Sequence, residues 1–179
     1  MNKELLRSEI QEFIGVNLRT DINQLILKNS VFEGVTNKEL AEQIVGKLKC
    51  KDKLPTWFEL KDVYFPPKIS IEQTSSEETA RYKSSLISGK SFIDLTGGFG
   101  VDDFYFSQVF DTIIHCELAP QLSAITAHNF RQLAVNNCEF ICGDGMRFLH
   151  DNDTVYDWIY LDPSRRSEAK GKVFLLKDC

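Results

Sequence analysis

Near residue 91 the sequence begins a regular exchange of short apolar segments and amphipathic segments. The apolar segments read SFIDL, TIIHCEL, CEFICGD and YDWIYLDP. They are too continuously apolar for strands with one face in water, so we expect both faces to be covered. Segments with helical periodicity stand between them, and one opens at Pro120, a favoured first residue of a helix. This order predicts an α/β fold in which helices cover both faces of a parallel sheet.

The chain before this exchange is helical in pattern. Thr36 and Glu39 have the spacing of a capping box, and a helical periodicity follows them. A Pro-Pro pair in VYFPPKISIEQ is then expected to exclude helix from the connecting segment. Ser75 and Glu78 form a second candidate capping box, whose helix we expect Gly89 to end. The sequence therefore divides into a helical region (1–54), a connector (55–74) and an α/β domain (75–179).

An acidic residue stands at the carboxyl end of each expected strand: Asp94, Glu117, Asp144 and Asp162. In an open α/β sheet, ligands bind outside the carboxyl ends of the strands, where the strand order reverses. One such acid could be a helix cap or a turn residue, but four successive ones are expected to converge on a single crevice. The first strand also runs into TGGFG, where glycines permit a sharp turn or the close approach of a ligand.

The glycine loop discriminates between classes of nucleotide. Gly98 and Gly100 match the first two glycines of the dinucleotide-binding pattern, but Asp103 occupies the place of the third. A carboxylate at this helix terminus repels a pyrophosphate, and no G-K-[ST] sequence follows that would form a P-loop. The loop therefore favours a cationic ligand without phosphate. S-adenosylmethionine (SAM) fits this description, because it combines a sulfonium and an amino group with a ribose diol and an adenine.

Composition limits the partners and the location. The net charge of −5 and the pI of about 5.3 do not give the basic footprint of a free-standing nucleic-acid module. The cysteines and histidines lack metal-ligand spacing, so no metal site is expected. The N-terminus lacks the apolar core of a signal peptide, and no segment approaches the length of a membrane span. A cytoplasmic location is therefore expected.

Four ordered segments, DLTGGFGVD, CEL, CGDGM and YLDPSRR, resemble motifs I to IV of the class I SAM-dependent methyltransferases, which have a Rossmann-like fold. More narrowly, ISIEQTSSEETARYK and DPSRR are similar to segments of the bacterial THUMP-like-domain methyltransferases. Members of that family continue past motif IV with further strands and a THUMP-like module. The resemblance therefore implies the N-terminal part of such a protein, with RNA as its partner. DPSRR is closer to the DPPR or DPPK forms of RNA base methyltransferases than to (D/N)PP(Y/F).

The resemblance and the strand-end positions together assign cofactor contacts. Asp94 would hold the amino group of SAM, Glu117 the ribose hydroxyls and Asp144 the adenine N6. Gln73 and Thr74 would receive the carboxylate, with plain helix capping as the alternative. Asp102 would share the task of Asp94 or cap the following helix. The remaining expected contacts lie in the same motifs and are Thr96, Gly98, Phe99, Gly100, Leu118, Gly145 and Met146.

Motif IV supplies the expected catalytic residues. Asp162 and Pro163 would lie beside the transferred methyl group, where an enzyme positions the nucleophile and removes a proton. Arg165 and Arg166 would hold a phosphate of the RNA. A solvated basic loop is the alternative for these two arginines.

Two other functions stay open from the sequence: a SAM-fold module that binds without catalysis, and an NAD-dependent oxidoreductase. The missing third glycine argues against the oxidoreductase. We further expect the chain to bind SAM without methylating RNA. Because WIYLD is apolar and β-prone, we also expect self-association through an exposed sheet edge.

Overall fold

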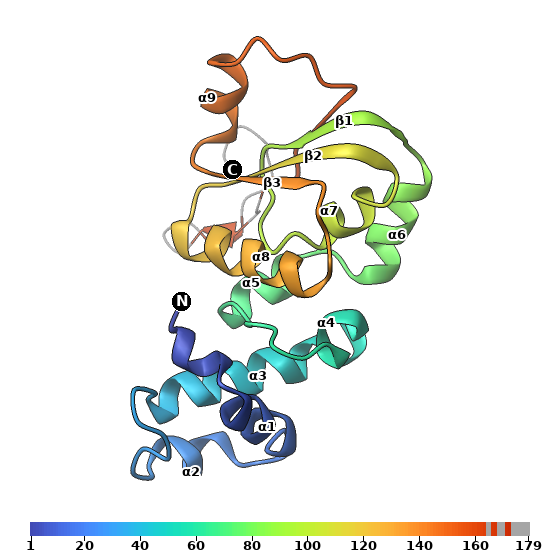
Figure 1. Ribbon diagram of the computed structural model, residues 1–179. Coiled ribbons are helices and arrows are strands. Elements are labelled where there is room, and N and C mark those ends of the chain that lie inside the picture. The colour runs from blue at the N-terminus through green and yellow to red at the C-terminus, as the bar shows by residue number, and fades with distance from the viewer. Residues whose placement is uncertain (164–165, 168–170, 173–179) are drawn as a thin grey trace.

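The computed structural model describes residues 1–163, 166–167 and 171–172, and its centre is a four-stranded parallel sheet (Figure 1). The strands are β1 (Gly89–Asp94), β2 (Phe110–Glu117), β3 (Cys138–Cys142) and β4 (Trp158–Tyr160), in the order β3-β2-β1-β4. The order reverses at β1, because β2 and β3 follow on one side of it and β4 lies on the other. The predicted α/β class is confirmed. A short antiparallel pair, β5 (Arg166–Ser167) and β6 (Gly171–Lys172), is separate from this sheet.

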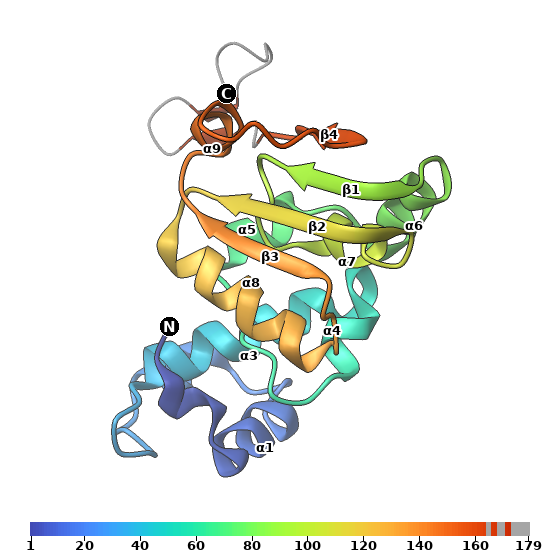
Figure 2. The same ribbon diagram turned by 45° about the horizontal axis from the view of Figure 1, so that its top comes forward.

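Helices lie on both faces of the sheet, as predicted. α6 (Glu77–Ser85), α7 (Val101–Phe106) and α8 (Pro120–Gln132) lie on one face, and α9 (Gly145–His150) lies on the other (Figure 2). Alternate residues of each strand serve the two faces. Phe92 packs in one cluster with Phe106, whereas Ile93 packs in another with Phe148. This two-sided burial explains why the strands are apolar throughout.

The N-terminal region is helical, as predicted, and contains η1 (Lys3–Leu6), α1 (Ser8–Val16), α2 (Ile22–Ile26) and α3 (Asn37–Lys53). The predicted capping box opens α3. The amide of Glu39 donates to Thr36 Oγ1 at 3.2 Å, and the amide of Thr36 donates to Glu39 Oε2 at 2.8 Å. Among the described residues, no helix combines the length and apolar character needed to cross a membrane.

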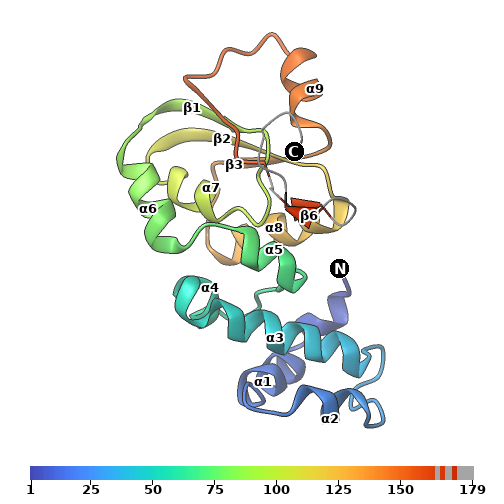
Figure 3. The ribbon, with the colours of Figure 1, turned by 180° about the vertical axis from the view of Figure 1, so that it is seen from behind.

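The connector is more helical than the sequence suggested. α4 (Pro55–Glu59) and α5 (Lys68–Gln73) both fall within it, between α3 and the α/β domain (Figure 3). Pro55 is the first residue of α4, and Pro67 is the N-cap of α5. The N–H groups of the first helical turn have no partner within the helix. Proline, which has no N–H, can therefore open a helix although it cannot continue one. The prediction of a non-helical connector was therefore wrong.

Two boundary predictions around α6 were also wrong. Ser76 rather than Ser75 caps the helix, since its Oγ accepts the amide N–H three residues later. The hydroxyl of Ser75 instead donates to Asp102 at 3.0 Å. The helix ends at Ser85, and Gly89 is the first residue of β1. A Cβ at Gly89 would lie 2.9 Å from the ring of Phe110, so close strand packing accounts for this glycine.

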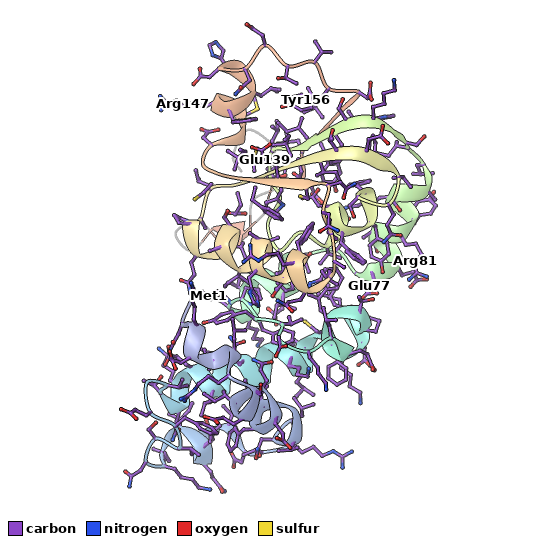
Figure 4. All side chains as sticks on the ribbon, in the orientation of Figure 1. Met1, Glu77, Arg81, Glu139, Arg147 and Tyr156 are labelled. Carbon is purple, nitrogen blue, oxygen red and sulfur yellow. The ribbon has the colours of Figure 1, made fainter. Side chains whose placement is uncertain are left out.

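One buried core joins the helical region to the α/β domain. It contains Leu5 and Ile44 from the first part of the chain together with Val101 and Ile125 from the second. Glu77 of α6, which is labelled in Figure 4, adds a polar connection between the two regions. Its carboxylate accepts hydrogen bonds from the Thr56 amide at 2.6 Å, the Thr56 hydroxyl at 2.8 Å and the Tyr105 hydroxyl at 2.8 Å.

Two buried side-chain amides hold the extended segment between α4 and α5. The amide group of Gln43 on α3 accepts from the backbone N–H of Phe65 at 2.9 Å and donates to its carbonyl at 2.8 Å. Asn129 on α8 makes the equivalent pair with Tyr64, at 2.9 Å in both directions. Adjacent residues of one segment are thus bonded to helices of both regions, which fixes the helical region against the sheet domain.

Candidate functional site

A cavity of about 680 Å³ opens where the strands of the sheet end. The acids that follow the four strands all line it, as the sequence predicted, and Asp102 of α7 joins them. The described lining contains no lysine or arginine. The other predicted cofactor and catalytic residues line the same cavity, except Gly100, and they are Gln73, Thr74, Thr96, Gly98, Phe99, Leu118, Gly145, Met146 and Pro163. A concave site with this charge favours a cationic ligand.

The glycine loop between β1 and α7 is held in a conformation that needs glycine. Gly98 and Gly100 have φ angles of 57° and 75°, in the left-handed region that glycine adopts without strain. Gly100 is the N-cap of α7, where a Cβ would lie 2.6 Å from Thr126, so it packs on α8. Gly97 carries a different constraint, since a Cβ there would overlap the imidazole ring of His115. The sequence did not single out Gly97, because its constraint comes from another strand.

Asp94 forms part of the cavity at the end of β1. Its Oδ1 accepts hydrogen bonds from the Thr96 amide at 2.7 Å and the Thr96 hydroxyl at 3.2 Å. The residue is 2% exposed, and burial together with the carboxyl group of Asp103 raises the pKa of Asp94 well above its usual range. A bound cation would favour the ionised carboxylate. A proton and a positively charged ligand group therefore compete for Asp94.

Glu117, at the end of β2, fixes the glycine loop. Its Oε2 accepts from the Gly98 amide at 3.0 Å, and its Oε1 accepts from the Ala119 amide at 2.7 Å. The sequence had suggested a ligand contact for this residue, with a surface turn as the alternative. Each carboxylate oxygen has a further lone pair, so the predicted contact to ribose hydroxyls is compatible with these bonds and stays a prediction.

Asp144 opens α9 as its N-cap. Its Oδ1 accepts from the Met146 amide at 2.9 Å, so the capping role that is common for such acids is present. Gly145 is required by close packing, because a Cβ there would lie 2.7 Å from the carbonyl oxygen of Leu95. Met146 and Leu118 give this end of the cavity an exposed apolar wall, at 60% and 72% exposure. The contact of Asp144 with adenine stays a prediction.

Phe99 lines the cavity, but it is 2% exposed and packs on Trp57 of α4, with ring centroids 6.1 Å apart. Its contact with the adenine ring stays a prediction. Gln73 ends α5 and Thr74 is its C-cap. Neither caps α6, so the capping alternative that the sequence left open does not apply to this helix.

Lys83 of α6 gathers a polar cluster at one side of the cavity. Its Nζ donates to Tyr160 OH at 2.6 Å, to Ser75 Oγ at 3.0 Å and to Asp102 Oδ2 at 3.0 Å, and lies 3.4 Å from Asp162 Oδ2. Burial, followed by the carboxylates of Asp102 and Asp162, raises the pKa of Tyr160 far above its usual range. The phenol therefore stays protonated and donates to one of these carboxylates. Asp102 does not cap α7, which corrects one of the two roles considered for it.

Asp162 connects the segment after β4 to the glycine loop. Its amide donates to Thr96 Oγ1 at 2.8 Å. Its Oδ2 faces the Lys83 cluster, while its Oδ1 makes no hydrogen bond within the described residues. The side chain is 56% exposed, so that second oxygen is accessible as a proton acceptor. Arg165 lies outside the described residues, and only the backbone of Arg166, in β5, is described.

Sequence reasoning missed Lys83 and Tyr160 as site residues. Lys83 is one basic residue of a helix that precedes the first strand, and its spacing from motif IV carries no signal. The alternation of strand residues could have found Tyr160, since it pairs in register with Asp94 and so shares its face of the sheet.

The fold and the cavity together define the class: this is the Rossmann-like α/β fold of methyltransferases. A candidate methyltransferase from Porphyromonas gingivalis W83 is similar, with 28% sequence identity and a TM-score of 0.78 over 92% of this chain. The chain spans 41% of the length of that protein. No protein-family model and no curated protein matches the sequence.

More distant likenesses reach other methyltransferases. A candidate RNA methyltransferase from Pyrococcus horikoshii is 20% identical, with a TM-score of 0.46 over 65% of this chain and 61% of that one. A candidate methyltransferase from Streptococcus mutans, in complex with SAH, is 23% identical, with a TM-score of 0.37 over 43% of this chain and 44% of that one. These two likenesses are too weak to carry an argument about function.

Proposed function

We propose that this chain binds SAM and belongs to an enzyme that methylates RNA. The observation that carries the proposal is the acidic cavity at the glycine loop, whose described lining has five carboxylates, of which two, Asp102 and Asp162, are paired with Lys83. A cofactor with a sulfonium and an amino group, and without phosphate, is the ligand class that such a lining favours. The likeness to the candidate methyltransferase of Porphyromonas gingivalis W83 supports the same class of enzyme.

The residues of the cavity fit this cofactor. At Gly98 the nearest atom to an added Cβ would be 3.8 Å away, so a ligand has room to approach the backbone. Asp102 Oδ1 is buried without a hydrogen-bond partner among the described residues, which suits a ligand donor. In this proposal Asp94 holds the amino group and Glu117 holds the ribose. The adenine and the carboxylate are assigned to the residues predicted for them, namely Asp144, Gln73 and Thr74.

Bound SAM supplies an electrophilic methyl group attached to a positively charged sulfur. The task of the chain is to orient the acceptor atom in line with that methyl group and to remove its proton. Asp162 is suited to this, because its Oδ1 is free within the described residues while Lys83 and Tyr160 hold its Oδ2. In this reaction Asp162 would accept the proton that the acceptor atom loses when it is methylated.

RNA as the acceptor rests on two resemblances: that of ISIEQTSSEETARYK and DPSRR to segments of the bacterial THUMP-like-domain methyltransferases, and that of DPSRR to the DPPR and DPPK forms of some RNA base methyltransferases. The net charge of −5 means that contacts to phosphates would depend on local basic groups. Arg165 and Arg166 are the residues that we propose for this task. A cytoplasmic location is part of the same proposal.

Titration calorimetry with SAM, S-adenosylhomocysteine (SAH) and NAD tests the cofactor. We expect SAM and SAH to bind and NAD to show no heat of binding. Binding of NAD without SAM would replace the proposal with an oxidoreductase. Transfer of tritiated methyl groups from SAM to unmodified bulk RNA then tests the reaction. Binding of SAM without transfer, by a protein that extends beyond residue 179, would support a non-catalytic binding module.

A further inference from the structure

One ammonium group, that of Lys83 on α6, lies between two carboxylates of the cavity wall. Its Nζ is 3.0 Å from Asp102 Oδ2 and 3.4 Å from Asp162 Oδ2. Two hydroxyl groups complete its surroundings, with Tyr160 OH at 2.6 Å and Ser75 Oγ at 3.0 Å. The two carboxylates and the two hydroxyls all line the cavity. The cluster therefore joins elements that are distant in sequence at one side of the site.

The number of hydrogens in the cluster fixes the direction of the bonds around Asp102. Lysine has three N–H donors and no acceptor, so the oxygens of Tyr160 and Ser75 accept from Lys83. The third N–H goes to Asp102 Oδ2, which is nearer than Asp162 Oδ2. The single hydroxyl hydrogen of Ser75 is then donated to Asp102 Oδ2, at 3.0 Å. Asp102 Oδ2 thus accepts two hydrogen bonds without any contribution from Tyr160.

The same count leaves the phenol hydrogen of Tyr160 for Asp162. Tyr160 OH lies 3.3 Å from Asp162 Oδ2 and 3.4 Å from Asp102 Oδ2. The oxygen of Asp102 already has two donors, whereas Asp162 Oδ2 otherwise has only the longer contact with Lys83 within the described residues. Donation therefore runs from Lys83 to Tyr160 and from Tyr160 to Asp162.

We propose that Lys83 and Tyr160 are positioning residues for Asp162. Lys83 donates to the phenol oxygen and so orients the hydroxyl, and the hydroxyl donates to Asp162 Oδ2. Asp162 Oδ1 is thereby left for the proton of the acceptor atom. The inference rests on the proposed function, because Asp162 is the group that takes this proton there. Neither Lys83 nor Tyr160 touches the acceptor or the cofactor, and both act through Asp162.

Tyr160 is suited to hold a carboxylate because its ring is fixed by packing. The ring lies against Phe106 of α7, with centroids 5.4 Å apart, and against Phe92 of β1, with centroids 6.0 Å apart. The main chain of Asp162 is held as well, since its amide donates to Thr96 Oγ1 at 2.8 Å. A base that is fixed at both its main chain and its side chain stays close to its working geometry.

The charges around the phenol support a hydroxyl that donates. Burial, followed by the charges of nearby carboxyl groups, raises the pKa of Tyr160 far above its usual range. Tyr160 therefore keeps its hydrogen. The side chains of Lys83 and Asp102 are 26% and 13% exposed, so this part of the cluster is shielded from water. Asp162, at 56%, is open to an acceptor.

The competing arrangement sends the phenol hydrogen to Asp102 and leaves Asp162 with the ion pair alone. The Cζ carbon of Tyr160, observed by NMR in the 179-residue chain without ligand, separates the two, because its chemical shift depends on the hydrogen bond of the phenol. Asparagine replaces an ionised acceptor by a weaker neutral one. We expect Asp162→Asn to move the Cζ signal more than Asp102→Asn does. Equal shifts, or the opposite order, overturn the inference.

A second experiment separates this role from a role in cofactor binding. We expect Tyr160→Phe to bind SAH within about threefold of the wild-type chain, because the lost hydroxyl serves Asp162 and not the cofactor. In a protein that extends beyond residue 179, Tyr160→Phe should slow methyl transfer from saturating SAM to unmodified bulk RNA by at least about tenfold. Tyr82→Phe removes the same hydroxyl from a side chain that is 66% exposed on α6, and should change neither measurement.

Lys83→Met, which removes the ammonium from a side chain of similar length, provides a second variant. It should slow methyl transfer by at least about tenfold, because the phenol loses the donor that orients it. Lys90→Met removes the same charge from an exposed residue near the start of β1, the opposite end of the strand from the cavity, and should transfer normally. Normal transfer by a folded Lys83→Met overturns the role of the lysine.

Because Tyr160 acts through Asp162, the effects of the two residues should not add. In an Asp162→Asn background, Tyr160→Phe should slow methyl transfer by less than about twofold further. A full additional loss would show that Tyr160 acts elsewhere, and it overturns the inference. A loss of SAH binding by Tyr160→Phe that equals its loss of transfer does the same.

The inference and the proposed function fail in different ways. A wild-type protein that transfers methyl groups, together with a Tyr160→Phe variant that transfers at the same rate, overturns the inference and leaves the proposed function intact. A wild-type protein that binds neither SAM nor SAH, or that binds SAM without transfer, removes the proposed function, and the positioning role fails with it. The comparison of Cζ shifts then still decides where the phenol hydrogen lies.

Discussion

At Gly97 the backbone of the glycine loop lies directly against a side chain of β2, the imidazole ring of His115. Gly98 and Gly100 need glycine because of their own backbone angles, whereas Gly97 needs it because of a neighbour. Backbone preference is a local property that a sequence pattern can reveal. Contact with His115 is a through-space property, and the sequence alone carried no sign of it.

This difference predicts which of two glycine substitutions lowers the free energy of unfolding more. Gly97→Ala should lower the free energy of unfolding more than Gly98→Ala, whose left-handed backbone costs about 1–2 kcal/mol. Overlap with a buried ring adds strain that the packed core cannot easily relieve. Urea denaturation of both variants measures the order. In a His115→Ala background the ring is gone, so Gly97→Ala should cost much less. An equal cost in both backgrounds would show that the ring is not the obstacle.

Glu117 combines a structural bond to the loop with a predicted bond to the ligand. Glu117→Ala should weaken the binding of SAM and SAH alike by at least about tenfold, because charge-assisted hydrogen bonds contribute about 1.5–3 kcal/mol. Calorimetry of the folded variant measures this loss. Glu139→Ala, an exposed acid on β3, is the matched control and should bind normally. An unchanged dissociation constant in Glu117→Ala would remove the residue from the ligand site.

At the site, what could be predicted from sequence was the set of residues that follow strands. Asp94 and Asp162 were found because parallel strands end at one edge and their acids must meet there. Lys83 was missed because a helix face has no fixed relation in sequence to a distant strand end. The roles of the site residues stay predictions, since contacts with a ligand depend on the ligand.

Among the elements, the strands and the two longest helices followed from apolar periodicity and caps. α4 and α5 did not, because each is only one or two turns long. Pro55 is the first residue of α4, and Pro67 is the N-cap of α5. Such helices are stabilised by tertiary contacts rather than by their own sequence. Trp57 of α4 illustrates this, since it is fully buried against Phe104 of the α/β domain.

The hydrogen bonds of the segment between α4 and α5 predict how much stability is lost when the two regions are no longer held together. Asn129→Ala should lower the free energy of unfolding by about 2–4 kcal/mol, because it leaves the buried N–H and carbonyl of Tyr64 without partners. Chemical denaturation followed by tryptophan fluorescence measures the change, and Arg131→Ala on the exposed side of α8 is the control. A loss below about 1 kcal/mol would mean that water or a shifted side chain replaces both bonds.

For the whole molecule, the alternation of strands and helices was enough to predict the α/β class, and the position of the helical region was not. That region is placed by buried amides and a shared core, which are specific to this chain. Self-association, which the sequence predicts, is also a property of the whole molecule. In the described structure β4 pairs with β1 on one side only, so its other side is a sheet edge.

The composition of this edge predicts concentration-dependent association of the 179-residue chain. Trp158, Ile159 and Leu161 are 43%, 53% and 45% exposed along and just after β4, and an apolar edge strand is a template for pairing with another chain. Light scattering should therefore give a mass above that of the monomer as concentration rises. Ile159→Lys should restore the monomer, because a charge on an edge strand opposes pairing. Val16→Lys replaces an apolar side chain that is 76% exposed on α1, away from the sheet, and should leave association unchanged. A wild-type chain that stays monomeric throughout, or equal rescue by Val16→Lys, would show that the edge of β4 does not drive association.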